Sequence, residues 1–120
     1  MSRKEVAMQR VVALVIALAT AGLSTAAAAA DAPPDGKKLY EANCAKCHGV
    51  DGAADTPIGK AMKAHVLKDP KFAEIDAATV IHTVRDNPKH KAVQGKVTNA
   101  ELTAIAGHIR ELAGGSAASH

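Results

Sequence analysis

The clearest alternation of hydrophobic and polar positions lies near the C-terminal end of the chain. Thr98 and Glu101 have the spacing of a capping box, in which each side chain accepts a hydrogen bond from the other residue's backbone N–H. Gly114 and Gly115 follow the last apolar position, as expected after a helix. The apolar residues in between recur with a period of 3.6: Leu102, Ile105, Ala106, Ile109, Leu112 and Ala113. The pattern therefore predicts a helix that begins after Thr98.

Three shorter helical segments precede this one. The first begins after the N-cap residue Asp35 and runs to Cys44, and residues 58–64 form one or two turns. The third begins after Asp76 and ends before Pro88. The apolar positions expected to face inward are Leu39, Tyr40, Val80, Ile81 and Val84. Because we find no strand alternation, internal repeat or second domain, the chain predicts an all-α fold of about four helices.

The first 30 residues have the three-part pattern of a secretory signal peptide. Residues 1–10 contain three basic side chains, residues 11–23 carry no charge, and residues 24–30 are small. We expect cleavage after Ala30, which leaves residues 31–113 as the domain and 114–120 as a flexible tail. The mature protein is then periplasmic and has no membrane span, and an uncleaved signal that anchors it to the membrane is the alternative.

The composition of residues 31–120 leaves a thin apolar core. These residues include 18 large apolar side chains, of which only Tyr40 and Phe72 are aromatic. So few large apolar residues indicate either a barely folded chain or a core filled by something other than amino acids. The 12 basic and 11 acidic residues of this part nearly cancel, and aromatic side chains for stacking bases are scarce, so nucleic-acid binding is not expected.

The two cysteines lie in the run Cys44-Ala45-Lys46-Cys47-His48. Two thiols one helical turn apart lie on the same face, where each can form a thioether with one vinyl group of haem. The next residue, His48, can then bind the iron as the proximal axial ligand. A zinc site and a redox-active disulfide are the alternatives that this spacing leaves open.

These residues resemble the class I c-type cytochromes, in particular the small bacterial monohaem kind, from Gly36 to Ala113. The resemblance implies one covalently attached haem c with its iron, wrapped by about four helices, of which the first and last cross closely. It places Gly36 and Tyr40 at that crossing, with Tyr40 near the cofactor, and it places His108 where the family usually has an aromatic residue. It also implies that a backbone carbonyl at Pro57 accepts the Nδ1 hydrogen of His48; the alternative is that Pro57 is an ordinary turn proline.

The sixth iron ligand departs from the pattern of the family. The family uses a methionine before the last helix, but no methionine follows Met62 in this chain, and His90 occupies the matching position. An imidazole is a good iron ligand, so we predict that His90 is the distal axial ligand. The alternatives are that Met62 binds the iron, or that His90 is a solvated loop residue and the sixth position is open or holds water.

The expected function is that of a periplasmic carrier of single electrons and not of an enzyme. We expect transient redox partners to dock near Lys46, Lys89 and Lys91, because basic residues round a haem edge attract acidic proteins. A haem-based binder or sensor of a diatomic gas is the alternative, and it requires an open or displaceable sixth position. A peroxidase-like enzyme would need distal acid–base groups, which the sequence does not provide.

Overall fold

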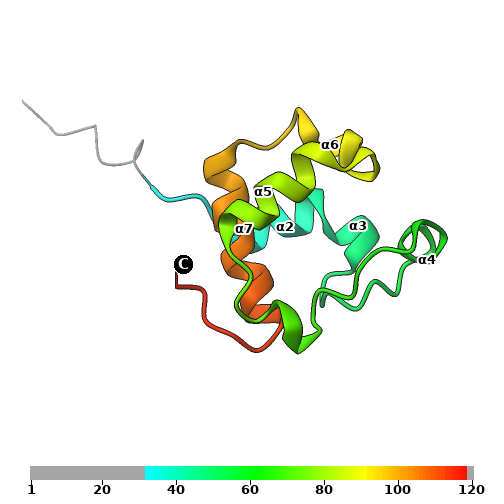
Figure 1. Ribbon diagram of the computed structural model, residues 1–120, viewed down its shortest axis with the longest axis horizontal. Helices are drawn as coiled ribbons and strands as arrows, with labels where there is room; N and C mark the ends of the chain where they lie inside the picture. Colours follow the sequence, from blue (N-terminus) through cyan, green and yellow to red (C-terminus); the bar gives the residue numbers. More distant parts are fainter. Residues whose placement is uncertain (1–31, 119–120) are drawn as a thin grey trace, which may run out of the picture. The chain divides into compact units, whose positions relative to one another are not determined.

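The polypeptide forms short helices joined by turns and by longer loops (Figure 1). The computed structural model describes residues 32–118, so the predicted signal peptide lies outside the described residues. The helices, labelled as in Figure 1, are α2 (Gly36–Asn43), α3 (Ala45–His48), α4 (Pro57–Met62), α5 (Ala77–Asp86), α6 (Lys91–Gln94) and α7 (Asn99–Leu112), with 3₁₀ helices η1 (Pro70–Phe72) and η2 (Pro88–His90). Residues 32–118 contain no strand and no helix long and apolar enough to cross a bilayer.

Three predicted N-caps are confirmed, and the segment predicted at residues 58–64 forms α4 at Pro57–Met62. Asp35, Asp76 and Thr98 each accept a hydrogen bond from the backbone N–H three residues further on. The side chain of Glu101 accepts from the backbone N–H of Thr98 at 2.8 Å, which completes the capping box. These local interactions satisfy backbone donors that a helix otherwise leaves unpaired at its N-terminus.

Helices α2 and α7 cross at close range (Figure 1). A Cβ atom on Gly36 would lie 2.1 Å from the carbonyl oxygen of Ala104, so only glycine lets the two backbones approach this closely. One turn further along α2, the ring of Tyr40 lies against the ring of His108, with centroids 5.1 Å apart. The crossing through a glycine and an aromatic residue is as predicted, with His108 in the place of the second aromatic residue.

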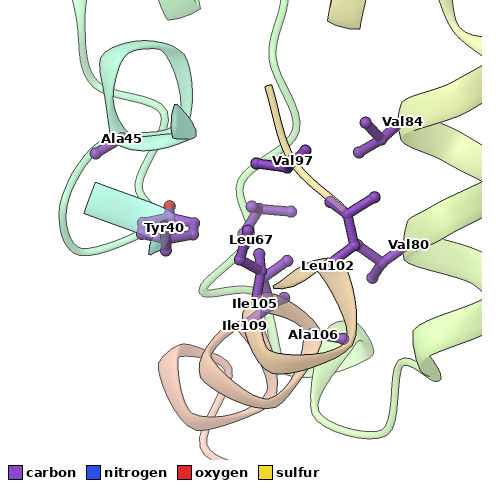
Figure 2. Packing of buried hydrophobic residues seen from close by; sticks show 10 residues of the cluster. All are labelled: Tyr40, Ala45, Leu67, Val80, Val84, Val97, Leu102, Ile105, Ala106 and Ile109. Carbon is purple, nitrogen blue, oxygen red and sulfur yellow. The ribbon is translucent and has the colours of Figure 1, made fainter. Parts of the chain in front are cut away.

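The core forms where α5 packs on α7 and the side chain of Tyr40 closes the opposite side. In Figure 2 the side chains of Leu102 and Ile105 lie between Tyr40 and the valines Val80 and Val84 of α5. Leu102 and Ile105 are each only 1% exposed. The core is built mainly from aliphatic side chains, and its members are Tyr40, Ala45, Leu67, Val80, Val84, Val97, Leu102, Ile105, Ala106 and Ile109.

Three short elements, η1, η2 and α6, were not predicted from the hydrophobic pattern because they are too short to show a period. A local signal was nevertheless present for two of them. Asp69 precedes Pro70 and Asn87 precedes Pro88, and each polar side chain accepts a hydrogen bond from the backbone N–H two residues further on. Proline fits the first position of such a turn because it has no N–H to leave unpaired.

The segment after α7 makes contacts that its composition does not predict. Arg110 is only 2% exposed, and its guanidinium donates to the carbonyls of Ile75, Ser116 and Ala117 at 2.8, 3.0 and 3.0 Å. Small residues with two glycines predicted a flexible tail for residues 114–120. The carbonyls of Ser116 and Ala117 are held against α7 by the buried side chain of Arg110.

Candidate functional site

The motif with two cysteines folds into a single helical turn. The backbone N–H of His48 donates to the carbonyl of Cys44 at 3.0 Å, and the Thr56 hydroxyl donates to the carbonyl of Lys46 at 2.8 Å. Both thiols are free and half-buried. Burial raises the pKa of the Cys44 thiol to about 11, with a smaller contribution from Cys47. The turn therefore presents two thiols one helical turn apart, as attachment to two vinyl groups requires.

A zinc site has little support from this geometry. The two cysteines are present as free thiols. Among residues 32–118 no group of three or more His, Cys, Asp and Glu side chains is arranged to hold a metal ion. Structural zinc normally takes four such ligands, so the described residues do not provide a zinc site.

The Nδ1 atom of His48 faces a backbone carbonyl, as predicted, but the carbonyl belongs to a different residue. Nδ1 lies 2.9 Å from the carbonyl oxygen of His65, so the prediction that Pro57 accepts this hydrogen is wrong. Pro57 is instead the first residue of α4, and a carbonyl in the first turn of a helix points along the helix axis. The contact with His65 favours the tautomer in which Nδ1 carries the hydrogen and Nε2 has the free lone pair.

Helix α4 packs directly on the turn that carries the cysteines. A Cβ atom on Gly59 would lie 2.1 Å from the carbonyl oxygen of Cys47, so a side chain at this position would collide with the motif. The Thr56 hydroxyl accepts from the backbone N–H of Gly59 at 2.8 Å and also donates to the motif. One threonine therefore starts α4 and fixes it to α3.

His90 lies opposite His48 across the site. The two imidazole rings are nearly parallel, at 14°, and their centroids are 6.3 Å apart. An iron ion bonded to one nitrogen of each ring at about 2 Å, a typical length for imidazole on a first-row metal, would separate the centroids by about 6 Å. The spacing of the two rings therefore fits a metal bound between them.

Both imidazoles are held in surroundings that favour the neutral form. Burial lowers the pKa of His48 and of His90, and a metal-bound imidazole must be neutral. Nδ1 of His90 is buried without a hydrogen bond, although the backbone of Thr83 is near enough to favour the charged ring to a smaller extent.

Tyr40 supports the site from the helix crossing. Its side chain is fully buried, and its hydroxyl donates to the carbonyl of Gly49 at 2.7 Å. Burial is also the main reason that the pKa of Tyr40 is raised, so the hydroxyl keeps its hydrogen and remains a donor. Because Gly49 directly follows His48, this bond links α2 to the proximal side of the site.

The remaining predicted site residues are placed without a defined contact to either ring. Met62 is half-buried, and its backbone carbonyl accepts a hydrogen bond from Nζ of Lys89 at 2.9 Å. Lys46 and Lys91 are exposed. The sequence could not reveal that the His65 carbonyl faces Nδ1 of His48. Every residue has a backbone carbonyl, and only the fold brings this one to the ring.

A helical chain with two thiols one turn apart, followed directly by a histidine, is typical of a c-type cytochrome. The sequence model of the family described as Cytochrome c matches residues 34–113, and the chain belongs to this family. It is similar to a cytochrome c6 from Synechococcus sp., with 30% identity over 100 residues that cover 82% of this chain and 86% of that protein. No solved structure matches the chain significantly. The cofactor is accordingly a covalently attached haem c with its iron, as predicted, and Cys44 and Cys47 fit its attachment site.

Proposed function

We propose that this chain is an exported monohaem cytochrome that carries single electrons between redox proteins, with His48 and His90 as the two axial ligands. The observation that carries the proposal is the pair of nearly parallel imidazoles, at 14°, with centroids 6.3 Å apart. Membership of the cytochrome c family and the similarity to a cytochrome c6 support the role of carrier.

Haem, when bound, supplies an iron that changes reversibly between the ferrous and ferric states. The protein residues hold that centre in place. Cys44 and Cys47 tether it, and the contact from His48 Nδ1 to the His65 carbonyl, at 2.9 Å, keeps the proximal imidazole in one orientation. A neutral imidazole from His90 on the other side leaves no open position for a substrate, which suits transfer of electrons and not catalysis.

The choice of histidine as distal ligand has a consequence for the reduction potential. A thioether ligand raises the potential of a c-type haem, so an imidazole in its place gives a lower value. We therefore expect this protein to exchange electrons with partners of lower potential than those of a cytochrome with a methionine ligand.

The basic residues near the site support docking of acidic partners. Lys46 precedes Cys47, and Lys89 and Lys91 flank His90, and all three lysines are exposed. Exposed charges of this kind speed the encounter of two proteins and act less on the final affinity, which suits brief contacts between electron carriers. Membrane-bound and soluble acidic redox proteins are both compatible with this surface.

Export follows from the predicted signal peptide of residues 1–30, and the periplasm is the proposed location. The mass of the mature protein, recovered from the periplasmic fraction, tests this point. We expect a chain that begins at Asp31 and carries one haem. A full-length chain recovered with the membranes would instead support an uncleaved anchor.

The distal ligand is tested by absorption spectroscopy of the haem-containing protein. Wild type should be low-spin and six-coordinate, and His90→Ala should become high-spin or bind water. His82→Ala is the matched control, because His82 is an exposed histidine paired with Asp86 on the outside of α5. An unchanged low-spin spectrum in His90→Ala contradicts the assignment and would direct attention to Met62. His90→Met should raise the reduction potential.

The rate at which carbon monoxide binds to the reduced protein distinguishes the carrier from the gas-binding alternative. A carrier with a bound His90 should react slowly with carbon monoxide in the reduced state, at a rate that stops rising at high gas concentration. A fast reaction proportional to the gas concentration in wild type would support a gas binder or sensor with an open sixth position.

A further inference from the structure

The connector between α5 and α7, residues 87–98, carries His90 and is bound to the end of α5 by one of its own side chains. Gln94, the last residue of α6, directs its side-chain amide back to the end of α5. Nε2 lies 3.0 Å from the carbonyl oxygen of Val84, 3.0 Å from that of Arg85 and 3.2 Å from that of Asn87. Three carbonyl acceptors around one nitrogen fix the orientation of the amide, because its oxygen would be repelled there.

The amide of Gln94 shares an acceptor with the backbone of His90. The carbonyl of Asn87 accepts from the backbone N–H of His90 at 2.9 Å and from Nε2 of Gln94 at 3.2 Å. Gln94 and His90 are therefore held to the same peptide group, which lies directly after the last turn of α5. A displacement of Gln94 therefore disturbs the turn that carries His90, because both residues donate to the carbonyl oxygen of Asn87.

Arg85, near the end of α5, binds the same connector through its side chain. Its guanidinium donates to the carbonyl of Gln94 and, at 2.6 Å, to the carbonyl of Val97. It also donates to the side chain of Asn99 at the start of α7, at 3.0 Å. The side chain of Gln94 thus binds the backbone of Arg85, while the side chain of Arg85 binds the backbone of Gln94.

We propose that Gln94, supported by Arg85, is the positioning residue that keeps His90 at the haem iron. The inference rests on the proposed function, because it requires His90 to be the distal ligand. Neither Gln94 nor Arg85 contacts a ring of the axial pair. Both act by holding the connector in the one arrangement that places the two imidazoles 6.3 Å apart.

The physical reason is that His90 leaves the iron more easily when the connector that carries it is held less firmly. The carbonyls of Val84 and Arg85 lie at the end of α5, where the helix provides no partners of its own. Removing the amide donor leaves these carbonyls unpaired when the connector is closed and lets them reach water when it is open. The open form, in which His90 is away from the iron, is then favoured.

The test uses Gln94→Met in the haem-containing protein, because methionine has nearly the same length and no donor. The measured quantity is the rate of carbon monoxide binding to the reduced protein at saturating gas, which equals the rate of His90 dissociation. The loss of one buried donor predicts a rise of about tenfold. Lys96→Met on the same connector is the matched control, because Lys96 is exposed and makes no side-chain hydrogen bond, and its rate should equal that of wild type.

The outcomes separate this inference from the proposed function. If His90→Ala reacts no differently from wild type, His90 is not the ligand and the proposed function fails. If His90→Ala reacts fast but Gln94→Met keeps the wild-type rate, the ligand assignment stands and the positioning role is wrong. If Gln94→Met lowers the melting temperature without changing the rate, its role is only structural, and the inference is also wrong.

A second variant keeps the inference testable if Gln94→Met yields no folded protein. Arg85→Lys retains the positive charge but cannot donate in the planar fork that reaches the Gln94 and Val97 carbonyls together. Its rate of carbon monoxide binding at saturating gas should also rise, by about threefold to tenfold. A rate equal to that of wild type in Arg85→Lys overturns the inference.

Discussion

The hydroxyl of Tyr40 and the carbonyl of Gly49 form a buried hydrogen bond of 2.7 Å between α2 and the residue that follows His48. Tyr40→Phe removes only this hydroxyl, and the Gly49 carbonyl keeps the backbone N–H of Gly52, at 3.1 Å, as its other donor. We expect the free energy of unfolding to fall by about 0.5–1.5 kcal/mol, the net value of one hydrogen bond. Urea denaturation of the haem-containing protein, followed by circular dichroism, measures this loss.

Tyr40→Leu serves as the comparison for that variant, because it also removes the ring that lies against His108. It should cost more than Tyr40→Phe, by about 1–2 kcal/mol, since it also leaves a cavity where the ring was packed. Equal stability of Tyr40→Phe and wild type would show that the bond to Gly49 makes no net contribution.

The close approach of α2 and α7 makes Gly36 sensitive to the smallest possible side chain. In Gly36→Ala the new Cβ would overlap the Ala104 carbonyl oxygen, a backbone atom that can move only with its helix. We expect destabilisation of about 1–3 kcal/mol or more, measured by thermal denaturation.

Gly95→Ala is the matched control for this collision. Nothing lies within 4 Å of the position that its Cβ would take, and its φ of −94° suits any residue. This variant should be neutral or stabilised by about 0.4–1 kcal/mol through the unfolded state. A similar loss of stability in both variants would mean that helix contact is not the cause.

Much of the fold was predictable because its signals are local. The caps at Asp35, Asp76 and Thr98 act within three residues, so the sequence displays them directly. The attachment motif is equally local, since a helical turn brings Cys44 and Cys47 together whatever surrounds them.

The contacts made between distant parts of the chain were not predictable. The carbonyl that faces His48 comes from His65, and a carbonyl carries no residue identity that a motif could reveal. Similarly, Arg110 and Gln94 look like ordinary surface residues in the sequence, and only the packed chain directs them at backbone carbonyls. Polar side chains that bind backbone over a long sequence separation therefore escape an analysis of patterns.

Acid should weaken the fold through the two half-buried imidazoles of His48 and His90. Burial lowers the pKa of His48 and His90 in the folded chain, so the unfolded chain binds more protons. These groups contribute fully to the free energy of unfolding above a pH of about 6.5, the ordinary pKa of histidine. The contribution is lost as the pH falls through their lowered pKa values in the folded chain. Urea midpoints measured from pH 7.5 to 4.5 should therefore decrease towards acid.

His90→Met isolates the share of His90 in this pH dependence. It removes one titrating imidazole and keeps a side chain that can bind iron, so the decrease in acid should become smaller and reflect mainly His48. An unchanged pH profile in His90→Met would show that His90 does not contribute to the acid sensitivity.

Arg110 links the end of α7 to the segment that follows it. Arg110→Met keeps the apolar stem but removes three hydrogen bonds. We expect the free energy of unfolding to fall by about 1–3 kcal/mol, together with faster hydrogen exchange in residues 113–118.

A chain that ends at Gly115 removes two of the three acceptors. Because both changes break the same bonds, the double variant should lose less than the sum of the two single losses. Strict additivity would argue against a coupling between Arg110 and this segment.

The thin core predicts that folding depends on the attached haem. The described core consists of small and medium aliphatic side chains with one aromatic ring, Tyr40, in the cluster of fully buried residues. A haem presents more apolar surface than any side chain, and removal of a single buried aromatic residue already costs about 3–5 kcal/mol. That loss approaches the whole stability of a small domain, about 5–15 kcal/mol. We therefore expect Cys44→Ala combined with Cys47→Ala to give a chain without haem and without a cooperative thermal transition.

Cys44→Ala alone retains one possible thioether and both imidazoles, so it should fold with reduced stability. A cooperative transition in the double variant without haem would show that the helices and the Gly36 crossing alone are sufficient for the fold.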